Sequence, residues 1–311
     1  MSGKMRILIA YDGSSCADAA LDDLRRAGLP SDAEALVLSV ADVWPPTSYD
    51  GAPAALDENL PAAVKMARAQ AIQAVQAAET LARQAADIVK TLFPDWEVRS
   101  EAVADSPAWA IIKLADQWPA DLVVLGSHGH SALHRFVLGS VSQKVLTEAR
   151  CSVRIARERH REGPLRLVIG VDGSPGAELA LHTLAGRDWP PDTQALVVAV
   201  MDTRLNVEEN AITPTAEGWV EASHAETVQW IDETVNEAAD QLRRTGLNVE
   251  TLIGDGDAQH VLVEAGETWG ADCVFVGASG MTRRSYMVLG SVSTAVAARA
   301  HCSVEVVRKA N

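Results

Sequence analysis

The sequence lacks the long apolar run of a membrane-spanning helix, the core of a signal peptide and the CxxC pairs of a typical zinc site. No apolar run approaches the roughly 20 residues that a membrane-spanning helix requires. Residues 1–6 carry no signal-peptide core and lead directly into a predicted strand. No CxxC pair is present, so we expect reduced thiols in the cytoplasm and no zinc site. The four cysteines are Cys16, Cys151, Cys273 and Cys302.

Positive charge is also scarce. The chain has 27 Lys and Arg residues against 42 Asp and Glu residues, which gives a formal net charge of −15. Nucleic acids and anionic membrane surfaces favour a basic protein face, so we expect neither as a partner. An anionic nucleotide needs only a local cradle of N–H groups, and the net charge does not exclude it.

The chain is a tandem duplication. Its 311 residues, 48% of them hydrophobic, suffice for two domains of about 150 residues each. Asp12-Gly13-Ser14 returns 160 residues later as Asp172-Gly173-Ser174, and Gly126-Ser-His-Gly129 returns after 151 residues as Gly277-Ala-Ser-Gly280. A loop after the second predicted strand can absorb the change of offset. We predict one domain over residues 1–157, a charged linker over 158–164 and a second domain over 165–311.

Both halves alternate buried strands with helices. This alternation predicts parallel sheets with helices on both faces, and right-handed crossovers restrict the topology to a doubly wound sheet. Ligands bind such sheets at the carboxyl ends of the strands, where the strand order reverses. In the first half the predicted strands are 4–11, 35–40, 96–103, 121–125 and 151–156, with helices over 14–27, 61–92, 106–118 and 140–149; in the second half the predicted strands are 165–171, 195–200, 248–253, 273–276 and 302–307.

A spaced glycine pattern follows the fourth strand of each half. In the first copy Gly126 and Gly129 are followed, after nine residues, by Gly139 and Ser140. Glycines allow the backbone to approach a bulky anion closely, and the N-terminus of the next helix offers unpaired N–H groups to a phosphate. We expect Ser140 to cap that helix with its hydroxyl. The second copy has Gly277, Gly280, Gly290 and Ser291 at the same spacing.

These motifs resemble the universal stress protein family over the whole of each half. The resemblance implies two Rossmann-like sheets of five strands in the order 3-2-1-4-5, similar to adenine nucleotide α-hydrolase-like folds. It also implies ATP binding with Mg²⁺ in both halves. Asp12 would face the adenosine, away from the phosphates, and the backbone of Val40 would meet the adenine. The remaining residues implied for the first site are Gly126, His128, Gly129, Gly139, Ser140 and Ser142; those implied for the second site are Asp172, Val200, Gly277, Gly280, Gly290, Ser291 and Ser293.

The chain departs from the family pattern in two places. Both closing strands begin with Cys-Ser-Val, where the family usually has a proline before the valine, and Ser279 stands where the first copy has His128. The second change would alter the second site. Because histidine titrates near pH ~6.5, we expect the first site to bind a triphosphate more tightly as the pH falls from about 8 to 6. His130 and His134 lie in the first loop with His128, and we expect no metal site there. Arg283 and Arg284 in the second loop would either contact the phosphates or form a solvated pair.

Three functions follow from this pattern. The first is a nucleotide-dependent stress-response sensor that hydrolyses ATP slowly at most, since no general base is recognisable. The second is an interaction protein of the same fold without nucleotide binding. The third is a related adenine-nucleotide enzyme, although the Asp12-Gly-Ser-Ser15 turn departs from the loop that such enzymes carry. No catalytic Ser/His/Asp or Cys/His arrangement occurs in both copies.

The closing strands, 151–156 and 302–307, would each leave an unpaired sheet edge. We therefore expect the two halves to pair through them as an intramolecular pseudo-dimer. The family resemblance also allows a homodimer of whole chains, and the downstream protein partner is not specified by the sequence.

Overall fold

A computed structural model describes residues 3–43, 61–129, 138–159, 161–201, 217–280 and 289–309. The first half contains β1 (Met5–Ala10), α1 (Ser15–Asp23), the 3₁₀ turn η1 (Leu24–Arg26), β2 (Ala33–Ala41), α2 (Ala62–Leu92), β3 (Glu97–Ala104), α3 (Pro107–Gln117), β4 (Leu122–Gly126), α4 (Ser140–Glu148) and β5 (Ser152–Ala156). The second half contains β6 (Arg166–Gly170), α5 (Pro175–Ala185), β7 (Gln194–Met201), α6 (Glu217–Arg243), β8 (Asn248–Asp255), α7 (Ala258–Thr268), β9 (Cys273–Gly277), α8 (Ser291–Arg299) and β10 (Ser303–Val307).

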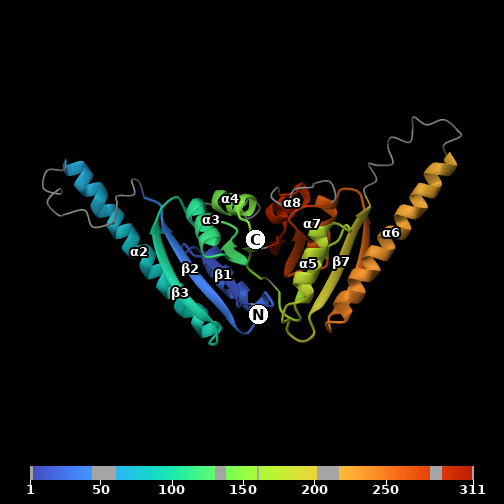
Figure 1. Ribbon diagram of the computed structural model, residues 1–311, viewed down its shortest axis with the longest axis horizontal. Helices are drawn as coiled ribbons and strands as arrows, with labels where there is room; N and C mark the ends of the chain where they lie inside the picture. Colours follow the sequence, from blue (N-terminus) through green and yellow to red (C-terminus); the bar gives the residue numbers. More distant parts are fainter. Residues whose placement is uncertain are drawn as a thin grey trace.

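The strands form one continuous sheet of ten, in the order β3-β2-β1-β4-β5-β10-β9-β6-β7-β8. Within each half the strands are parallel and follow the predicted order 3-2-1-4-5. The closing strands β5 and β10 pair in antiparallel fashion, so the predicted intramolecular pseudo-dimer is confirmed (Figure 1). Neither closing strand is a sheet edge, because each covers the other.

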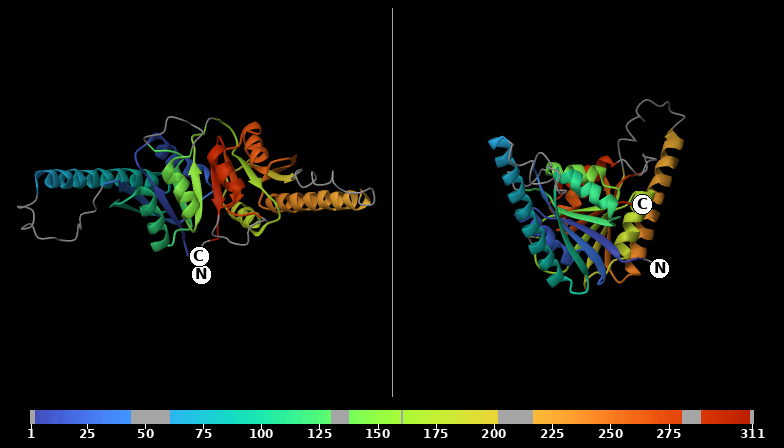
Figure 2. Two further views of the ribbon diagram at one scale, coloured as in Figure 1. Left: turned by 90° about the horizontal axis from the view of Figure 1, so that it is seen from above. Right: turned by 60° about the vertical axis from the view of Figure 1, so that its left-hand side comes forward.

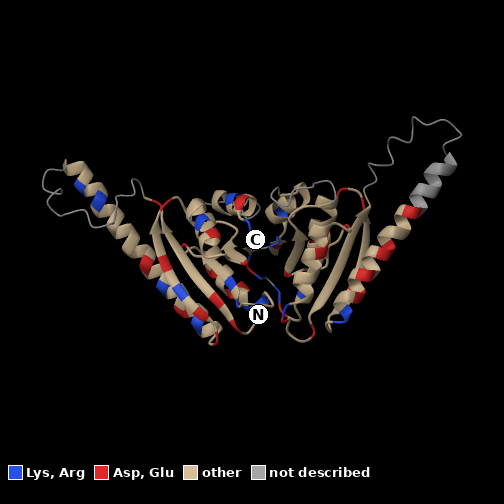
Figure 3. Ribbon diagram, in the orientation of Figure 1, with Lys and Arg blue, Asp and Glu red and all other residues tan. Residues whose placement is uncertain are grey.

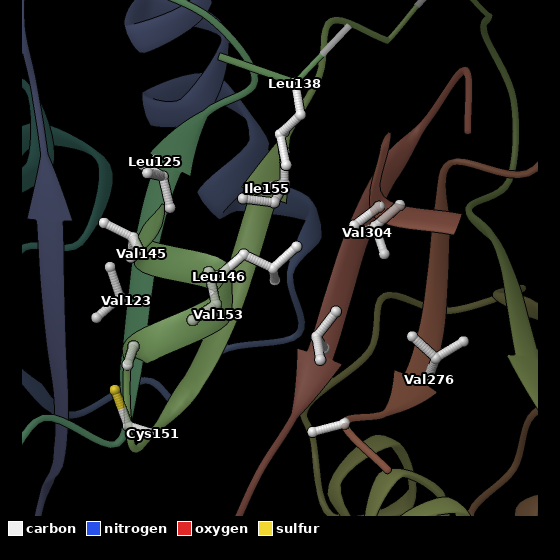
Figure 4. Packing of buried hydrophobic residues seen from close by; sticks show 14 of the residues in the cluster. Val123, Leu125, Leu138, Val145, Leu146, Cys151, Val153, Ile155, Val276 and Val304 are labelled. Carbon is white, nitrogen blue, oxygen red and sulfur yellow. The ribbon is translucent and has the colours of Figure 1, made fainter. Parts of the chain in front are cut away.

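The hydrophobic core has three parts. One cluster is shared by both halves, and it packs α3, α4, α7 and α8 against one face of the central strands. Figure 4 shows this cluster running from Val123 and Leu146 across the strand pair to Val304 and Val276. Two further clusters lie under α1 and α2 and under α5 and α6, each confined to its own half. The shared cluster therefore makes the junction between the halves part of the core.

Two long helices extend beyond the sheet on opposite sides of the molecule (Figures 1 and 2). Helix α2 has 31 residues, but its buried residues begin only at Ala78. At a rise of about 1.5 Å per residue, the helix is far longer than the strands it covers. Acidic and basic residues are mixed along α2, whereas the described charged residues of α6 are mostly acidic (Figure 3). No helix in the described ranges is long and apolar enough to cross a membrane.

Candidate functional site

Each half has a cavity at the carboxyl ends of its first, second and fourth strands. The cavity of the second half measures about 340 Å³, and that of the first about 140 Å³. All seven residues predicted for the second site line its cavity: Asp172, Val200, Gly277, Gly280, Gly290, Ser291 and Ser293. Six of the eight predicted for the first site line the smaller cavity, namely Asp12, Val40, Gly126, His128, Gly129 and Ser142, whereas Gly139 and Ser140 are not part of its lining.

A rigid turn positions the aspartate after the first strand of each half. Oδ1 of Asp12 accepts a hydrogen bond of 3.0 Å from the Ser14 N–H, and the Ser14 hydroxyl caps α1 by accepting from Ala17 N–H at 3.2 Å. The same two distances recur at Asp172, Ser174 and Ala177. The glycine between them has a φ of +76° in the first copy and +70° in the second, a conformation that other residues rarely adopt. Either Ser14 or Ser15 could cap this helix on the sequence alone, and the structure has Ser14 as the cap.

The second oxygen of each aspartate lies against the glycine loop. A Cβ placed on Gly129 would be 2.8 Å from Oδ2 of Asp12, and one on Gly280 would be 2.7 Å from Oδ2 of Asp172. The carboxylate of Asp12 therefore contacts the glycine loop, and its expected position relative to a bound phosphate stays a prediction. The aspartate and the second glycine of the motif meet because β1 and β4, and likewise β6 and β9, are neighbours in the sheet.

The first glycine of each motif has a packing role. A Cβ on Gly126 would be 2.7 Å from the backbone carbonyl of Cys16 at the start of α1. A Cβ on Gly277 would be 2.4 Å from the backbone of Gly176 at the start of α5. Contacts this short with a backbone leave no room for any side chain. These glycines line the cavities, and they also let the helix after the first strand approach the end of the fourth.

The helix that follows the loop begins at the predicted place but is capped differently. The N-cap of α4 is Gly139, whose N–H donates to the carbonyl of Ser127 at 2.9 Å and so closes the loop. Ser140 is an exposed residue of the first turn and makes no capping hydrogen bond in the structure described here, so the expected cap was wrong. The N–H groups of the first turn have no partner within the helix.

A buried serine ties each helix to the end of the fourth strand. The Ser142 hydroxyl donates to the carbonyl of Gly126 at 2.8 Å, and the Ser293 hydroxyl donates to the carbonyl of Gly277 at 2.7 Å. Both side chains are almost fully buried. The hydroxyl hydrogen is therefore used within the protein, and each serine fixes the helix start relative to the strand.

His128 distinguishes the first cavity from the second. Its Nδ1 lies 2.9 Å from the Ser127 hydroxyl, and its Nε2 is buried without a hydrogen-bond partner among the described residues. Burial, with a smaller contribution from the positive charge of Arg157, lowers the pKa of His128 below its ordinary value. Protonation of this ring therefore requires a lower pH than protonation of an ordinary histidine, and the tightening of the first site between pH 8 and 6 stays a prediction. In the second cavity the corresponding residue is Ser279.

Sequence reasoning missed the contribution of the helix after the third strand. The first turn of α3 lines the first cavity through Pro107, with Ile111 one turn further on. In the second half Asp257 caps α7 by accepting from Gln259 N–H at 2.8 Å, and both residues line the cavity. The available signal was the third strand itself, which ends at the same edge of the sheet as the other strands.

The remaining candidates in the loops cannot be placed. His130, His134, Arg283 and Arg284 lie outside the described residues. Within the described ranges no group of three or more His, Cys, Asp or Glu residues is arranged to hold a metal ion. All four cysteines are free thiols, and burial raises the pKa of Cys151 to about 11.

Comparison with known proteins agrees with this architecture. The universal stress protein Rv2005c of Mycobacterium tuberculosis is 26% identical over 326 residues, which cover 97% of both chains. A universal stress protein of Thermus aquaticus is 34% identical over 160 residues, 49% of this chain and 97% of that one. The crystal structure of a universal stress protein from Archaeoglobus fulgidus has the same fold, with a TM-score of 0.59 and 19% identity over 98% of this chain and 97% of that one.

The match to the family itself occurs twice and covers nearly the whole chain. Residues 4–157 and residues 165–308 each match the universal stress protein family. The chain is therefore a member of the universal stress protein family that carries two copies of the family's domain in tandem.

Proposed function

We propose that both halves bind ATP with Mg²⁺ and that the protein acts as a nucleotide-dependent module of a cytoplasmic stress response. The observation that carries this proposal is the repeated cavity, in which an aspartate, the first two glycines of the motif and residues from the first turn of the next helix converge in each half. The two copies of the sequence pattern form the same arrangement in each half, although the surrounding side chains differ between the two cavities.

The residues present fit a nucleotide triphosphate. The helix N-termini at Ser140 and Ser291 offer backbone N–H groups and the positive end of the helix dipole, which suit phosphate oxygens. Gly129 and Gly280 leave the loop free of side chains where it faces the aspartate. The walls on the sheet side are apolar, as adenine requires, and include Val40 in the first half and Val200 in the second. Mg²⁺ bound together with the nucleotide would offset the charge of the nearby carboxylate.

The two cavities would not bind the nucleotide equally. The second is more than twice as large as the first, and it has the small Ser279 where the first has the imidazole of His128. We therefore assign the tighter site to the second half. Binding rather than catalysis is the proposed activity, since no catalytic Ser/His/Asp or Cys/His arrangement occurs in both copies of the sequence.

Small molecules released from the purified protein would test the proposal directly. Mass spectrometry should identify an adenine nucleotide, and calorimetry of the nucleotide-free protein with ATP and Mg²⁺ should give two unequal sites. The absence of any heat with ATP, together with release of no nucleotide, would favour the interaction protein with an inactive pocket. Turnover of ATP at rates typical of enzymes would favour the related enzyme class.

A further inference from the structure

The junction between the halves brings equivalent residues of the two copies face to face. Arg154 is the third residue of β5, and Glu305, 151 residues later, is the third residue of β10. These two residues are direct partners in the antiparallel register, with Val153 opposite Val306 and Ile155 opposite Val304. The pseudo-twofold axis therefore passes between Arg154 and Glu305. If two identical halves paired in the same way, each of these residues would face its own copy.

Four buried charges alternate in sign across this axis. Asp23 accepts from Arg154 Nε at 2.6 Å, and Arg154 Nη1 donates to Glu305 Oε2 at 3.1 Å. Arg187 then pairs with the other oxygen of Glu305. All four side chains are at most 6% exposed. The first two belong to the first half and the last two to the second, so the order is negative, positive, negative, positive.

Pairing of like halves would break this order. Two first halves would place Arg154 against a second Arg154, and two second halves would place Glu305 against a second Glu305. Each half would keep its own ion pair, but the central contact would become repulsive. In a buried, poorly solvated site, an unsatisfied or like-charge contact is far more unfavourable than at a surface.

The shapes of the side chains at a second contact near the axis also disfavour the pairing of like halves. Gly28 and Asp188 are also equivalent positions, offset by 160, and the Asp188 N–H donates to the Gly28 carbonyl at 3.0 Å. The Trp189 ring lies over Gly28, where a Cβ would be 2.7 Å from it. Two second halves would bring Trp189 onto the side chain of Asp188, and two first halves would place the smaller Leu29 at the position of the indole.

We propose that this interface selects the unlike half, so that a first half pairs with a second half and neither pairs with itself. The partner that fits either surface is the other half of the same chain or the opposite half of a second chain. The duplication has therefore produced two surfaces that are complementary to each other and no longer self-complementary.

Cysteine pairs in the full chain can report which strands meet. Val153→Cys with Val306→Cys reports unlike pairing. Val153→Cys with Ile155→Cys reports β5 against β5 of another chain, and Val304→Cys with Val306→Cys reports β10 against β10. Each variant is refolded from denaturant at high concentration under reducing conditions and then oxidised, and links are mapped by peptide mass spectrometry. We expect the first pair to link efficiently and both like-half pairs to link at least about tenfold less. Comparable yields from a like-half pair would overturn the proposal.

A second set of variants reverses polarity and leaves each half with its own ion pair. Asp23→Arg/Arg154→Glu reverses the first half, and Arg187→Glu/Glu305→Arg reverses the second. Each double variant should lower the urea midpoint, because like charges then meet at the axis. The fourfold variant restores the alternation and should recover part of the lost midpoint. A fourfold variant no more stable than the weaker double variant would show that the order of charges across the axis does not matter.

Discussion

Gly280 and Asp172, which are 108 positions apart, are in such close contact that a Cβ on the glycine would be 2.7 Å from Oδ2 of the aspartate. Oδ1 of the same carboxylate is held by the Ser174 N–H, so the carboxylate cannot move away without losing that bond. The glycine and the aspartate therefore act as one unit of the site, and the same holds for Gly129 and Asp12.

Gly280→Ala should weaken ATP binding to the second half by at least about tenfold, or about 1.4 kcal/mol. The methyl group would displace the Asp172 carboxylate. If the glycine acts through that carboxylate, Gly280→Ala should add little once Asp172→Ala is present, because contacting residues are not additive. Calorimetry on the two single variants and the double variant measures this coupling. Fully additive losses would indicate that Gly280 contacts the nucleotide on its own.

Exchange of the residue that differs between the loops should alter the relative affinities. His128→Ser should enlarge the first cavity and raise its ATP affinity, by about tenfold if the imbalance is steric. Ser279→His should lower the affinity of the second site. Gly280→Ala and Gly129→Ala backgrounds isolate the first and second sites for calorimetry. An unchanged affinity in both exchanges would show that the His128 ring does not limit access.

Low pH should destabilise the protein through His128. Its folded-state pKa is lowered, mainly by burial, so the unfolded chain binds more protons once the pH falls below about 6.5. Stability should therefore fall from about pH 6.5 towards the folded-state pKa. His128→Gln should reduce this dependence, and His260→Gln, at an exposed position of α7, serves as the control. Urea midpoints at pH 7.5 and 5.5 measure the difference; equal slopes for wild type and His128→Gln would refute the assignment.

Trypsin sensitivity should reveal how the linker is held. Asp272 is buried and accepts from Arg159 at 2.7 Å, from Arg161 at 2.8 Å and from the Arg166 N–H at 2.8 Å. Asp272→Asn removes the charge that attracts both linker arginines, so cleavage after Arg159 and Arg161 should be several-fold faster. Asp121→Asn is the matched control, because Asp121 accepts from the Arg6 N–H at 2.8 Å in the equivalent place. Equal acceleration by both variants would indicate general loosening.

The topology was predictable because strands and helices alternate along the sequence of each half. The start of α2 was also predictable, since the helix begins within one residue of its expected start. The approximate position of both sites was predictable for the same reason, since parallel strands bring their carboxyl ends together. The cap of α4 could not be predicted. Gly139 precedes the first turn because its N–H donates to the carbonyl of Ser127, and this contact between distant residues is not visible in the local sequence. The lowered pKa of His128 also depends on tertiary burial, which no local pattern reports.

The pairing of the closing strands could be predicted from their apolar character, but their register could not. A shift by two residues would keep the same side chains on the same faces and would still separate Arg154 from Glu305. Only the three-dimensional structure shows that these two equivalent positions meet.

The continuous sheet also changes how many strand edges the protein exposes. Two separate five-stranded sheets would have four edges, whereas the joined sheet has β3 and β8 as its two edges within the described part of the chain. On β3 the exposed residues include Glu97, Arg99 and Glu101, and charges of this kind discourage the addition of a foreign strand. On β8 the exposed residues include the charged Glu250 and Asp255 and also the apolar Leu252 and Ile253. The exposed apolar pair makes β8 the edge at which another polypeptide would more readily extend the sheet.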